Sequence, residues 1–525
     1  MSSAAQATIQ LERRQIAQDQ RPANADVVIG KDILELLSTA MYVDSLTVFR
    51  EYIQNSADAI DEAFDTAILS EGDLATISID LDPIARDIRI RDNGIGLKPI
   101  EAEKVLTAFG ASGKRQKRAR GFRGVGRLAA LGYCQFLTFR TKAAGEACST
   151  EVRWDCRKLK TILHDPHYSG SLGRVVNEVV SITSMSASEP SDHFFEVHLE
   201  KVIRIKNDVL LNAEAIRRYV SQVAPLPFHE EFSHRNTLGA NLRRYIEAPR
   251  FRILMNPSDG PLTRPFRDTI EVTKEKTETV SGFEWIELRD SDESLRAVGW
   301  ILNHAYSGAL HGSPGIRGLR ARVGDIQIGG EDIFAQVFPE ERFNSWTVGE
   351  IHILDPKVVP NGRRDNFEHN TAYHSLIGQL VPIGRSLTKR CRISSARRNR
   401  IKRFQWDEQH VQESLRTLAQ NSLGKQSARA VRRDIAARLA QMEVLVGGNL
   451  IIEDDRADLG RRLVKLRGKF GSLDSSERAP DPFRSVPPKR RAIYEEVIGL
   501  IYECATNRVA AKALVDRLIA RLSAT

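Results

Sequence analysis

The chain has 525 residues, which is too long for a single hydrophobic core and predicts about two or three domains. Hydrophobic residues make up 41% of it and charged residues 28%, the composition of an ordinary globular protein. The formal net charge of +9 permits an acidic partner such as a nucleic acid but does not require one.

Cysteine use and hydropathy indicate a cytoplasmic protein. The five cysteines are odd in number and irregularly spaced, so they predict neither a disulfide framework nor a paired metal-ligand motif. The N-terminal segment is rich in Gln, Arg and Ala and lacks the apolar core of a signal peptide. No run of about eighteen apolar residues occurs, so we expect no membrane span.

The stretch from Ser45 to Ala67 has the pattern of an amphipathic helix with Ser45 as its N-cap. Glu51, Asn55 and Asp58 stand at i, i+4 and i+7 and share a narrow polar face. Asn and Asp form helices poorly, and with a Glu their oxygens are typical ligands of a hard cation. A solvated polar face is the alternative. The apolar face, which predicts packing on a sheet, consists of Leu46, Phe49, Ile53, Ile60 and Phe64.

Two strands follow this helix and end in a glycine-containing turn. Ala75–Leu81 and Asp87–Arg91 alternate in polarity around a short turn, which predicts a β-hairpin. The second strand is followed by Asp92-Asn93-Gly94-Ile95-Gly96. A carboxylate beside two residues without Cβ lets a flat ligand approach the backbone closely, although such a sequence is also common in plain turns.

A basic, glycine-containing segment begins at Gly110 and closes at Gly121-Phe122-Arg123-Gly124-Val125-Gly126, before a helical pattern at Leu128–Leu131. Glycines ahead of a helix present backbone N–H groups and a positive dipole end, which suits a phosphate chain. No Gly-Lys-Ser/Thr follows, so this is not a Walker A loop. The strands predicted to complete the sheet are Tyr133–Arg140, Ser149–Trp154, Arg174–Thr183 and Phe194–Leu199.

The order of these three elements resembles that of the GHKL ATPases, which include DNA gyrase, the heat-shock chaperone of ninety kilodaltons, histidine kinases and MutL. The resemblance is strongest to the chaperone, whose helix carries Arg-Glu-Leu-Ile-x-Asn-x-x-Asp-Ala-Leu-Asp. The sequence at 50–61 is Arg-Glu-Tyr-Ile-Gln-Asn-Ser-Ala-Asp-Ala-Ile-Asp. The resemblance covers roughly residues 25–370 and implies an α/β fold of the α+β two-layer sandwich type. A Bergerat-type ATPase domain with a four- or five-stranded mixed sheet would precede a β-α-β transducer-like middle domain and a mostly helical C-terminal region.

The resemblance also implies ATP and Mg²⁺ as cofactors. Glu51 would orient or deprotonate the attacking water, and Asn55 would be the main protein ligand of magnesium. Asp92 would accept a hydrogen bond from the adenine amino group, and Asp58 would support the adenine side. The family usually carries Gly-Thr on its last strand, whereas the matching strand here, His193–Leu199, has no Thr.

Glycines and backbone complete the implied nucleotide site. Gly94 and Gly96 would leave room for the base. Segment 112–120 would form the lid, with Ser112 and Lys114 as nucleotide contacts. The backbone that would contact the phosphates is that of Gly121, Phe122, Arg123, Gly124, Val125 and Gly126.

Residues 206–395 have the pattern of a second α/β unit, with the segment 360–368 near its end. The order of elements resembles the middle domain of the heat-shock chaperone, and this implies that Arg364 reaches the γ-phosphate from the second domain. Arg363 is the competing candidate, and a plain surface turn is the alternative. Strands in this unit are predicted at Phe251–Met255, Thr269–Thr273, Trp285–Leu288 and Val298–Leu302.

The last part of the chain is helical in pattern and lies outside the resemblance. The stretch Arg385–Arg403 is densely basic and contains no acidic residue, so it is either a solvated helix face or a contact for DNA, RNA or another polyanion. The predicted domain organisation is an N-terminal arm (1–25), the ATPase domain (26–205), the middle domain (206–395), a helical region (396–470), a linker (471–490) and a C-terminal helix (491–525).

Two functions are compatible with this organisation. The first is slow, Mg²⁺-dependent ATP hydrolysis by a chaperone-like GHKL ATPase, a homodimeric clamp that ATP closes on a protein client. The second is a MutL- or MORC-like nucleic-acid clamp in genome maintenance or in defence against foreign DNA. A regulatory nucleotide binder with little turnover is a third possibility.

Overall fold

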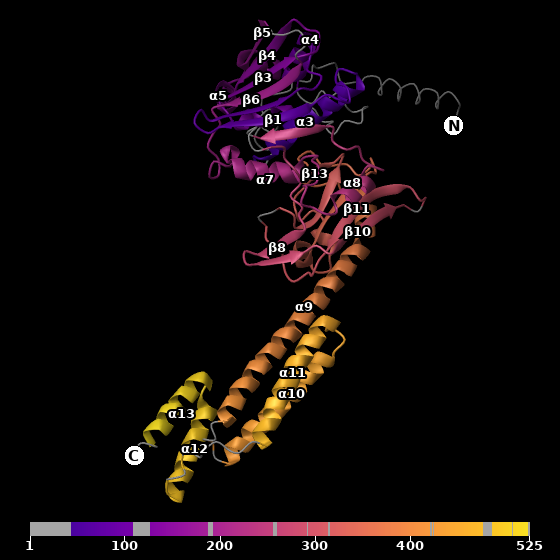
Figure 1. Ribbon diagram of the computed structural model, residues 1–525. Helices are drawn as coiled ribbons and strands as arrows, with labels where there is room; N and C mark the ends of the chain where they lie inside the picture. The colour runs from indigo at the N-terminus through magenta and orange to yellow at the C-terminus, as the bar shows by residue number, and fades with distance from the viewer. Residues whose placement is uncertain are drawn as a thin grey trace, which may run out of the picture. The chain divides into compact units, whose positions relative to one another are not determined.

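The computed structural model describes residues 44–108, 126–186, 193–255, 260–290, 292–312, 315–419, 423, 425–475, 483, 486–506 and 508–522. The chain divides into two compact units, which are described in turn (Figure 1). The first holds the described residues up to His304 with Leu310–Val337 and Thr347–Pro382, and the second holds Ala305–Ala309, Phe338–Trp346 and the chain from Ile383 onward.

Helix α3, Thr47–Asp65, is buried on nearly all sides. Of its 19 residues, 13 are buried, and they include Glu51 and Asp58, so the solvated polar face is not what forms. The helix starts after Leu46, which makes no side-chain cap. The predicted N-cap at Ser45 is therefore wrong. Asp44, rather than Ser45, contacts the start of the helix: its carboxylate accepts the N–H of Leu46 at 3.0 Å.

The first unit contains a seven-stranded sheet with the order β5-β4-β3-β6-β2-β1-β7. The predicted hairpin is confirmed as β1 and β2, and neighbouring strands are antiparallel except for β1 and β7. The bounds are β1 Ala75–Asp82, β2 Asp87–Asp92, β3 Phe136–Lys142, β4 Cys148–Asp155, β5 Val180–Ser186, β6 Phe194–Glu200 and β7 Phe251–Met255.

Strand β7 corrects both the predicted strand number and the predicted boundary between the first two domains. It pairs with β1 in parallel register, so a segment assigned to the middle domain extends the first sheet. Phe251, Ile253 and Met255 are buried in the same core as Ile53 of α3. Residues of helix α7, Ala213–Val223, also belong to this core, which continues to Leu262 rather than ending near residue 205.

One predicted strand is half helical. Residues 174–179 belong to helix α6, and only the part from Val180 onward is a strand. Leu172, Val175 and Val179 recur at helical spacing, and the two valines are buried on one face, which outweighs the strand propensity of Val. The other helices of this unit are α4 Pro99–Thr107, α5 Cys156–His164, α6 Leu172–Val179, α7 Ala213–Val223 and α8 Arg235–Leu242, with 3₁₀ turns η2 Gly126–Gly132, η3 Val209–Leu211 and η5 Ala335–Val337.

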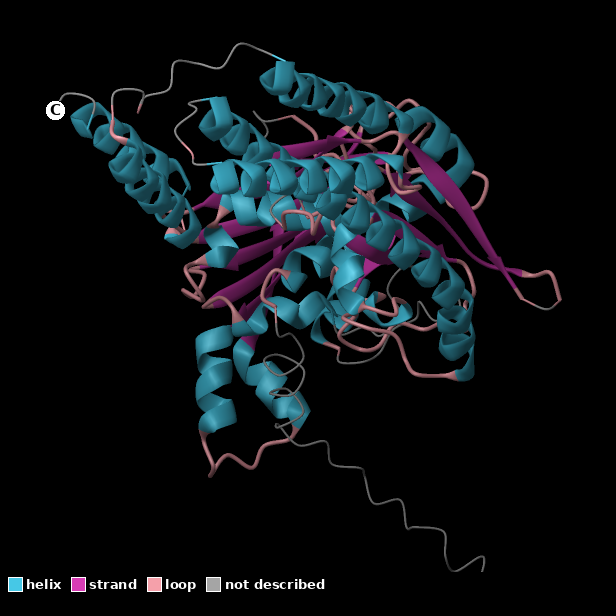
Figure 2. Ribbon diagram, turned by 90° about the horizontal axis from the view of Figure 1, so that it is seen from below, coloured by secondary structure: helices cyan, strands magenta, loops and turns pink. Residues whose placement is uncertain are grey.

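A second, five-stranded sheet with the order β10-β11-β14-β12-β13 also belongs to the first unit. Strands β12 and β14 are parallel, and the other neighbours are antiparallel. Strands and helices both contribute to the fold, as the predicted α/β class requires (Figure 2). The bounds are β10 Gly282–Arg289, β11 Leu295–Asn303, β12 Gly318–Val323, β13 Ile326–Ile328 and β14 Val348–Ile353, beside a hairpin of β8 Thr269–Thr273 and β9 Lys276–Thr279.

The second unit is mostly helical. Its helix boundaries differ from the predicted ones. Helix α9 runs across residue 395, the predicted end of the middle domain. The predicted C-terminal helix is two helices, because the backbone of Ala505 is extended. Among the described residues, no helix combines the length and apolar character that a membrane span requires. The elements are the turn η6 Glu341–Trp346, α9 Thr371–Ala419, which begins in the first unit, α10 Lys425–Gly447, α11 Glu453–Ser475, α12 Pro488–Cys504 and α13 Arg508–Leu522.

Candidate active site

Glu51 lies in the second turn of α3, and its side chain is only 11% exposed. One carboxylate oxygen, Oε1, is 3.6 Å from Arg50 Nη2 and 3.9 Å from Arg364 Nε. A carboxylate removed from water needs such cations nearby to offset the loss of hydration. The site therefore joins an acid of the first sequence motif to an arginine more than three hundred residues further along the chain.

Gly126 covers the other side of this carboxylate. A Cβ at position 126 would lie 2.1 Å from Glu51 Oε2, so a side chain here would displace the Glu51 carboxylate. Tyr52, the next residue on α3, donates its hydroxyl to the carbonyl of Arg127 at 2.9 Å. Burial lowers the pKa of Arg127, whose guanidinium donates to the carbonyl of Ala108 at 2.9 Å. These contacts fix the end of the glycine loop against Glu51.

Asp92 ends β2 and is 2% exposed. Its Oδ1 accepts the N–H of Gly94 at 2.9 Å, which closes a tight turn. The turn is attached to α3, because the N–H of Ile95 donates to the carbonyl of Ala59 at 3.1 Å. Asp92 thus lies beside the part of α3 that immediately follows Asp58.

The two glycines after Asp92 are required by the packing of the chain itself. A Cβ at Gly94 would lie 2.7 Å from the carbonyl carbon of Ala59. At Gly96, φ is +66° and a Cβ would lie 2.0 Å from the carbonyl oxygen of Lys142. The structure therefore explains both glycines by close approach to α3 and β3, whereas the sequence suggested room for a base.

The turn 361–366 brings Arg364 to Glu51. Arg364 has a left-handed backbone with φ +56°, which is sparsely populated outside glycine. Two contacts hold this conformation: the N–H of Gly329 donates to the Arg364 carbonyl at 2.9 Å, and Arg50 Nη1 donates to the same oxygen at 3.3 Å. Arg50 Nη2 also donates to the carbonyl of Arg363 at 3.0 Å.

Comparison with known proteins identifies the part of the chain that carries these residues. Residues 43–169, which include α3, the Asp92 turn and the glycine loop, match the family model of histidine kinase-, DNA gyrase B- and HSP90-like ATPases. This segment is a GHKL-type ATPase domain. The match does not reach the turn with Arg364, for which the resemblance stays a prediction.

The ATPase domain is similar to the chaperone protein HtpG of several bacteria. It is 34% identical to HtpG of Cupriavidus metallidurans over 142 residues, which are 24% of this chain and 22% of that protein. A longer alignment with HtpG of Bacillus subtilis is 27% identical over 189 residues, or 33% of this chain and 30% of that protein. The chain thus matches less than a third of the length of these relatives.

The other predicted site residues fall into two groups. Asn55 is half-buried on α3, one turn after Glu51, and Asp58 is 8% exposed one turn further. Seven predicted contacts lie outside the described residues: Ser112, Lys114, Gly121, Phe122, Arg123, Gly124 and Val125.

The donor set of the ATPase domain fits a magnesium ion that arrives with the nucleotide. The described residues contain no group of three or more His, Cys, Asp or Glu that could hold a metal ion. Asn55 offers one amide oxygen at the site. Mg²⁺ commonly takes one or two protein oxygens and completes its octahedron with phosphate oxygens and water, so a single Asn is a sufficient protein ligand.

Sequence reasoning missed two residues beside Asp92. Thr141 of β3 accepts the N–H of Leu97 at 2.8 Å, and His193 Nδ1 lies 2.7 Å from the carbonyl oxygen of Gly94. Thr141 and Asp92 both pair with Phe195, from opposite sides of β6. Thr141 and Asp92 therefore lie on the two strands that flank β6.

Proposed function

We propose that the chain hydrolyses ATP slowly with Mg²⁺, as a homodimeric clamp that ATP closes on a protein client. The observation that carries the proposal is the convergence of Glu51, Gly126 and Arg364 within the first unit. Similarity of the ATPase domain to proteins named as the chaperone HtpG supports the chaperone role.

The proposed chemistry follows from these three groups. Cleavage of the γ-phosphate requires a positioned water and neutralisation of charge on the phosphate oxygens. Glu51 takes the proton of the attacking water, and Arg364 moves from Glu51 to the γ-phosphate. Asn55 would hold Mg²⁺, which would supply further neutralisation of the phosphate charge. The ion pair between Arg364 and Glu51 must first open, which supports a slow reaction.

Removing the Arg364 side chain should slow hydrolysis and leave nucleotide affinity nearly unchanged. A charge-assisted hydrogen bond is worth about 1.5–3 kcal/mol, so Arg364→Ala should lower kcat by about 10- to 150-fold. Arg363→Ala is the matched control, because Arg363 is exposed and only its carbonyl contacts Arg50. Phosphate release measures both rates. A wild-type rate for Arg364→Ala, or an equal loss in Arg363→Ala, would remove the role from Arg364.

The clamp proposal predicts that ATP raises the molecular mass measured in solution from that of a monomer to that of a dimer. A Glu51→Ala variant, which is expected to hold ATP without cleaving it, should have the mass of a dimer with ATP and Mg²⁺. Light scattering behind a sizing column measures this. A monomer in both the presence and the absence of ATP would reject the clamp and leave the ATPase proposal standing.

The nucleic-acid clamp is not favoured. It rested on the basic lid, 112–120, which lies outside the described residues, and on the basic stretch 385–403. The arginines of that stretch partly bind acidic groups of the second unit. Arg392 donates to Glu340 at 2.7 Å, and Arg397 Nε donates to Asp455 at 2.7 Å. Cations satisfied in this way contribute little to a free polyanion-binding face.

A further inference from the structure

A second cavity, of about 600 Å³, lies in the first unit apart from the proposed ATP site. It is lined by residues of α8, of the segment that leads into β7, and of the second sheet. None of the residues assigned to the ATP site lines it. Its volume lies in the range of about 300–1,000 Å³ that is usual for small-molecule sites.

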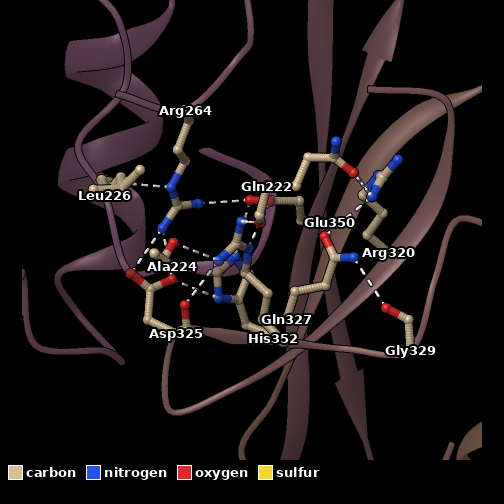
Figure 3. A network of polar contacts seen from close by, with 11 residues as sticks. Gln222, Ala224, Leu226, Arg264, Arg320, Asp325, Gln327, Gly329, Glu350 and His352 are labelled. Atoms are coloured by element: carbon tan, nitrogen blue, oxygen red, sulfur yellow. Dashed lines mark hydrogen bonds and ion pairs between the residues drawn. The ribbon is translucent and has the colours of Figure 1, made fainter. Parts of the chain in front are cut away.

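The floor of the cavity consists of Arg264, Asp325 and His352, which belong to a buried ionic network that continues behind them (Figure 3). Arg264 donates to Glu350 and to Asp325, both at 2.6 Å, and Arg322 Nε donates to the other oxygen of Glu350 at 2.6 Å. Two guanidinium groups and two carboxylates balance in charge. The network is therefore electrically neutral, and a ligand at the floor meets polar atoms rather than net charge.

His352 is the exception on this floor. It is 1% exposed, and neither ring nitrogen makes a hydrogen bond to the described residues. The nearest carboxylate oxygens belong to Glu350 at 3.5 Å and Asp325 at 3.7 Å. Burial lowers the pKa of His352, so the neutral ring offers one N–H and one lone pair. The Glu350 oxygen stands at the limit of hydrogen-bond distance, so a polar atom of a ligand would give the buried ring a closer partner.

The walls and rim of the cavity differ from its floor. The walls are apolar, with Leu226, Leu242 and Phe251 among them. The rim is cationic, because Arg243 and Arg252 are exposed there. Outside the floor, the lining contains four arginines, at 235, 243, 250 and 252, and two acids, Asp73 and Glu247.

We propose that this cavity binds a small organic anion. Arg243 and Arg252 hold its phosphate, sulfonate or carboxylate group, since guanidinium forms charge-assisted pairs with such oxyanions. An apolar body fills the space between Leu242 and Phe251. A polar atom at the far end of the ligand reaches His352.

The test uses 8-anilinonaphthalene-1-sulfonate, which combines an anionic group with a flat apolar body, and follows its fluorescence with the full folded chain. The wild type should bind it saturably at one site. The double variant Arg243→Gln/Arg252→Gln, at two exposed positions, should bind it at least tenfold more weakly. The matched control is Arg429→Gln/Arg433→Gln, which removes two exposed charges of α10 and should leave the affinity unchanged.

Three results would overturn the proposal: no saturable binding by the wild type, unchanged affinity in the cavity variant, or an equal loss in both double variants. The last would mean that the probe follows net charge alone. Each result leaves the ATPase proposal intact, because no residue of the ATP site is changed.

Discussion

Replacing Glu51 with alanine is expected to abolish ATP hydrolysis while ATP still binds. A general base contributes about 10²- to 10⁴-fold to a rate, so phosphate release should fall by that factor. Binding should persist, because the implied contacts to ATP come from Asn55, Asp92 and the glycine loop. Single-turnover phosphate release gives the rate, and titration calorimetry gives the affinity.

The control for this variant lies on the same helix. Asp65→Ala removes an exposed carboxylate of α3 that is 3.5 Å from Arg250, and it should leave the rate unchanged. Unchanged turnover in Glu51→Ala would refute the general base. Loss of both hydrolysis and binding would instead assign Glu51 a structural role as the partner of Arg50 and Arg364.

Replacing Glu350 with glutamine is expected to cause a large loss of stability in the first unit. Glu350 is fully buried and accepts from both Arg264 and Arg322. Removing one partner of a buried ion pair costs about 3–5 kcal/mol, because the remaining charge stays out of water. Urea unfolding followed by tryptophan fluorescence measures the change. Trp300, buried in the first unit, is one reporter.

The control is an exposed ion pair of the same unit. Glu231 is 76% exposed and lies 3.2 Å from Arg267, so Glu231→Gln should cost about 0–1 kcal/mol. Equal effects of the two variants would contradict the importance of the buried network.

The contribution of Glu350 to the free energy of unfolding should also depend on pH. Burial alone would raise its pKa, but Arg322 and Arg264 lower that pKa well below the usual 4.5. A depressed pKa gives stability that is present above the unfolded value and is lost as the pH falls through the folded value. The difference between wild type and Glu350→Gln should therefore shrink in strong acid. A constant difference from neutral to acid would contradict this assignment.

Short-range patterns in the sequence predicted much of the fold and several residues of the candidate site. The spacing of apolar residues predicted α3, alternation predicted the β1–β2 hairpin, and the order of three motifs predicted the ATPase domain. These features are encoded within short windows, where periodicity and turn chemistry are decisive. Glu51, Gly126 and Asp92 could be singled out because each belongs to such a window.

The remainder depends on contacts between distant segments. Nothing in the sequence near β7 indicates that it pairs with β1, and the position of Thr141 across β6 from Asp92 follows only from strand order. Arg50 carried a signal, since a charged residue beside Glu51 in a buried motif requires a partner, but the partner lies more than three hundred residues away. The network around Glu350 has no sequence signature.

The central claim is that Glu51, Asp92 and Asn55 belong to one working ATP site. It is tested most directly by phosphate release from ATP and Mg²⁺, with wild type and Asp92→Asn purified side by side. We predict slow, saturable release by the wild type and none by the variant. In Asp92→Asn one oxygen remains for the N–H of Gly94, while an NH₂ group, which is a donor, replaces the oxygen that would accept from the adenine amino group. Absence of release by the wild type, or equal release by both proteins, would contradict the account.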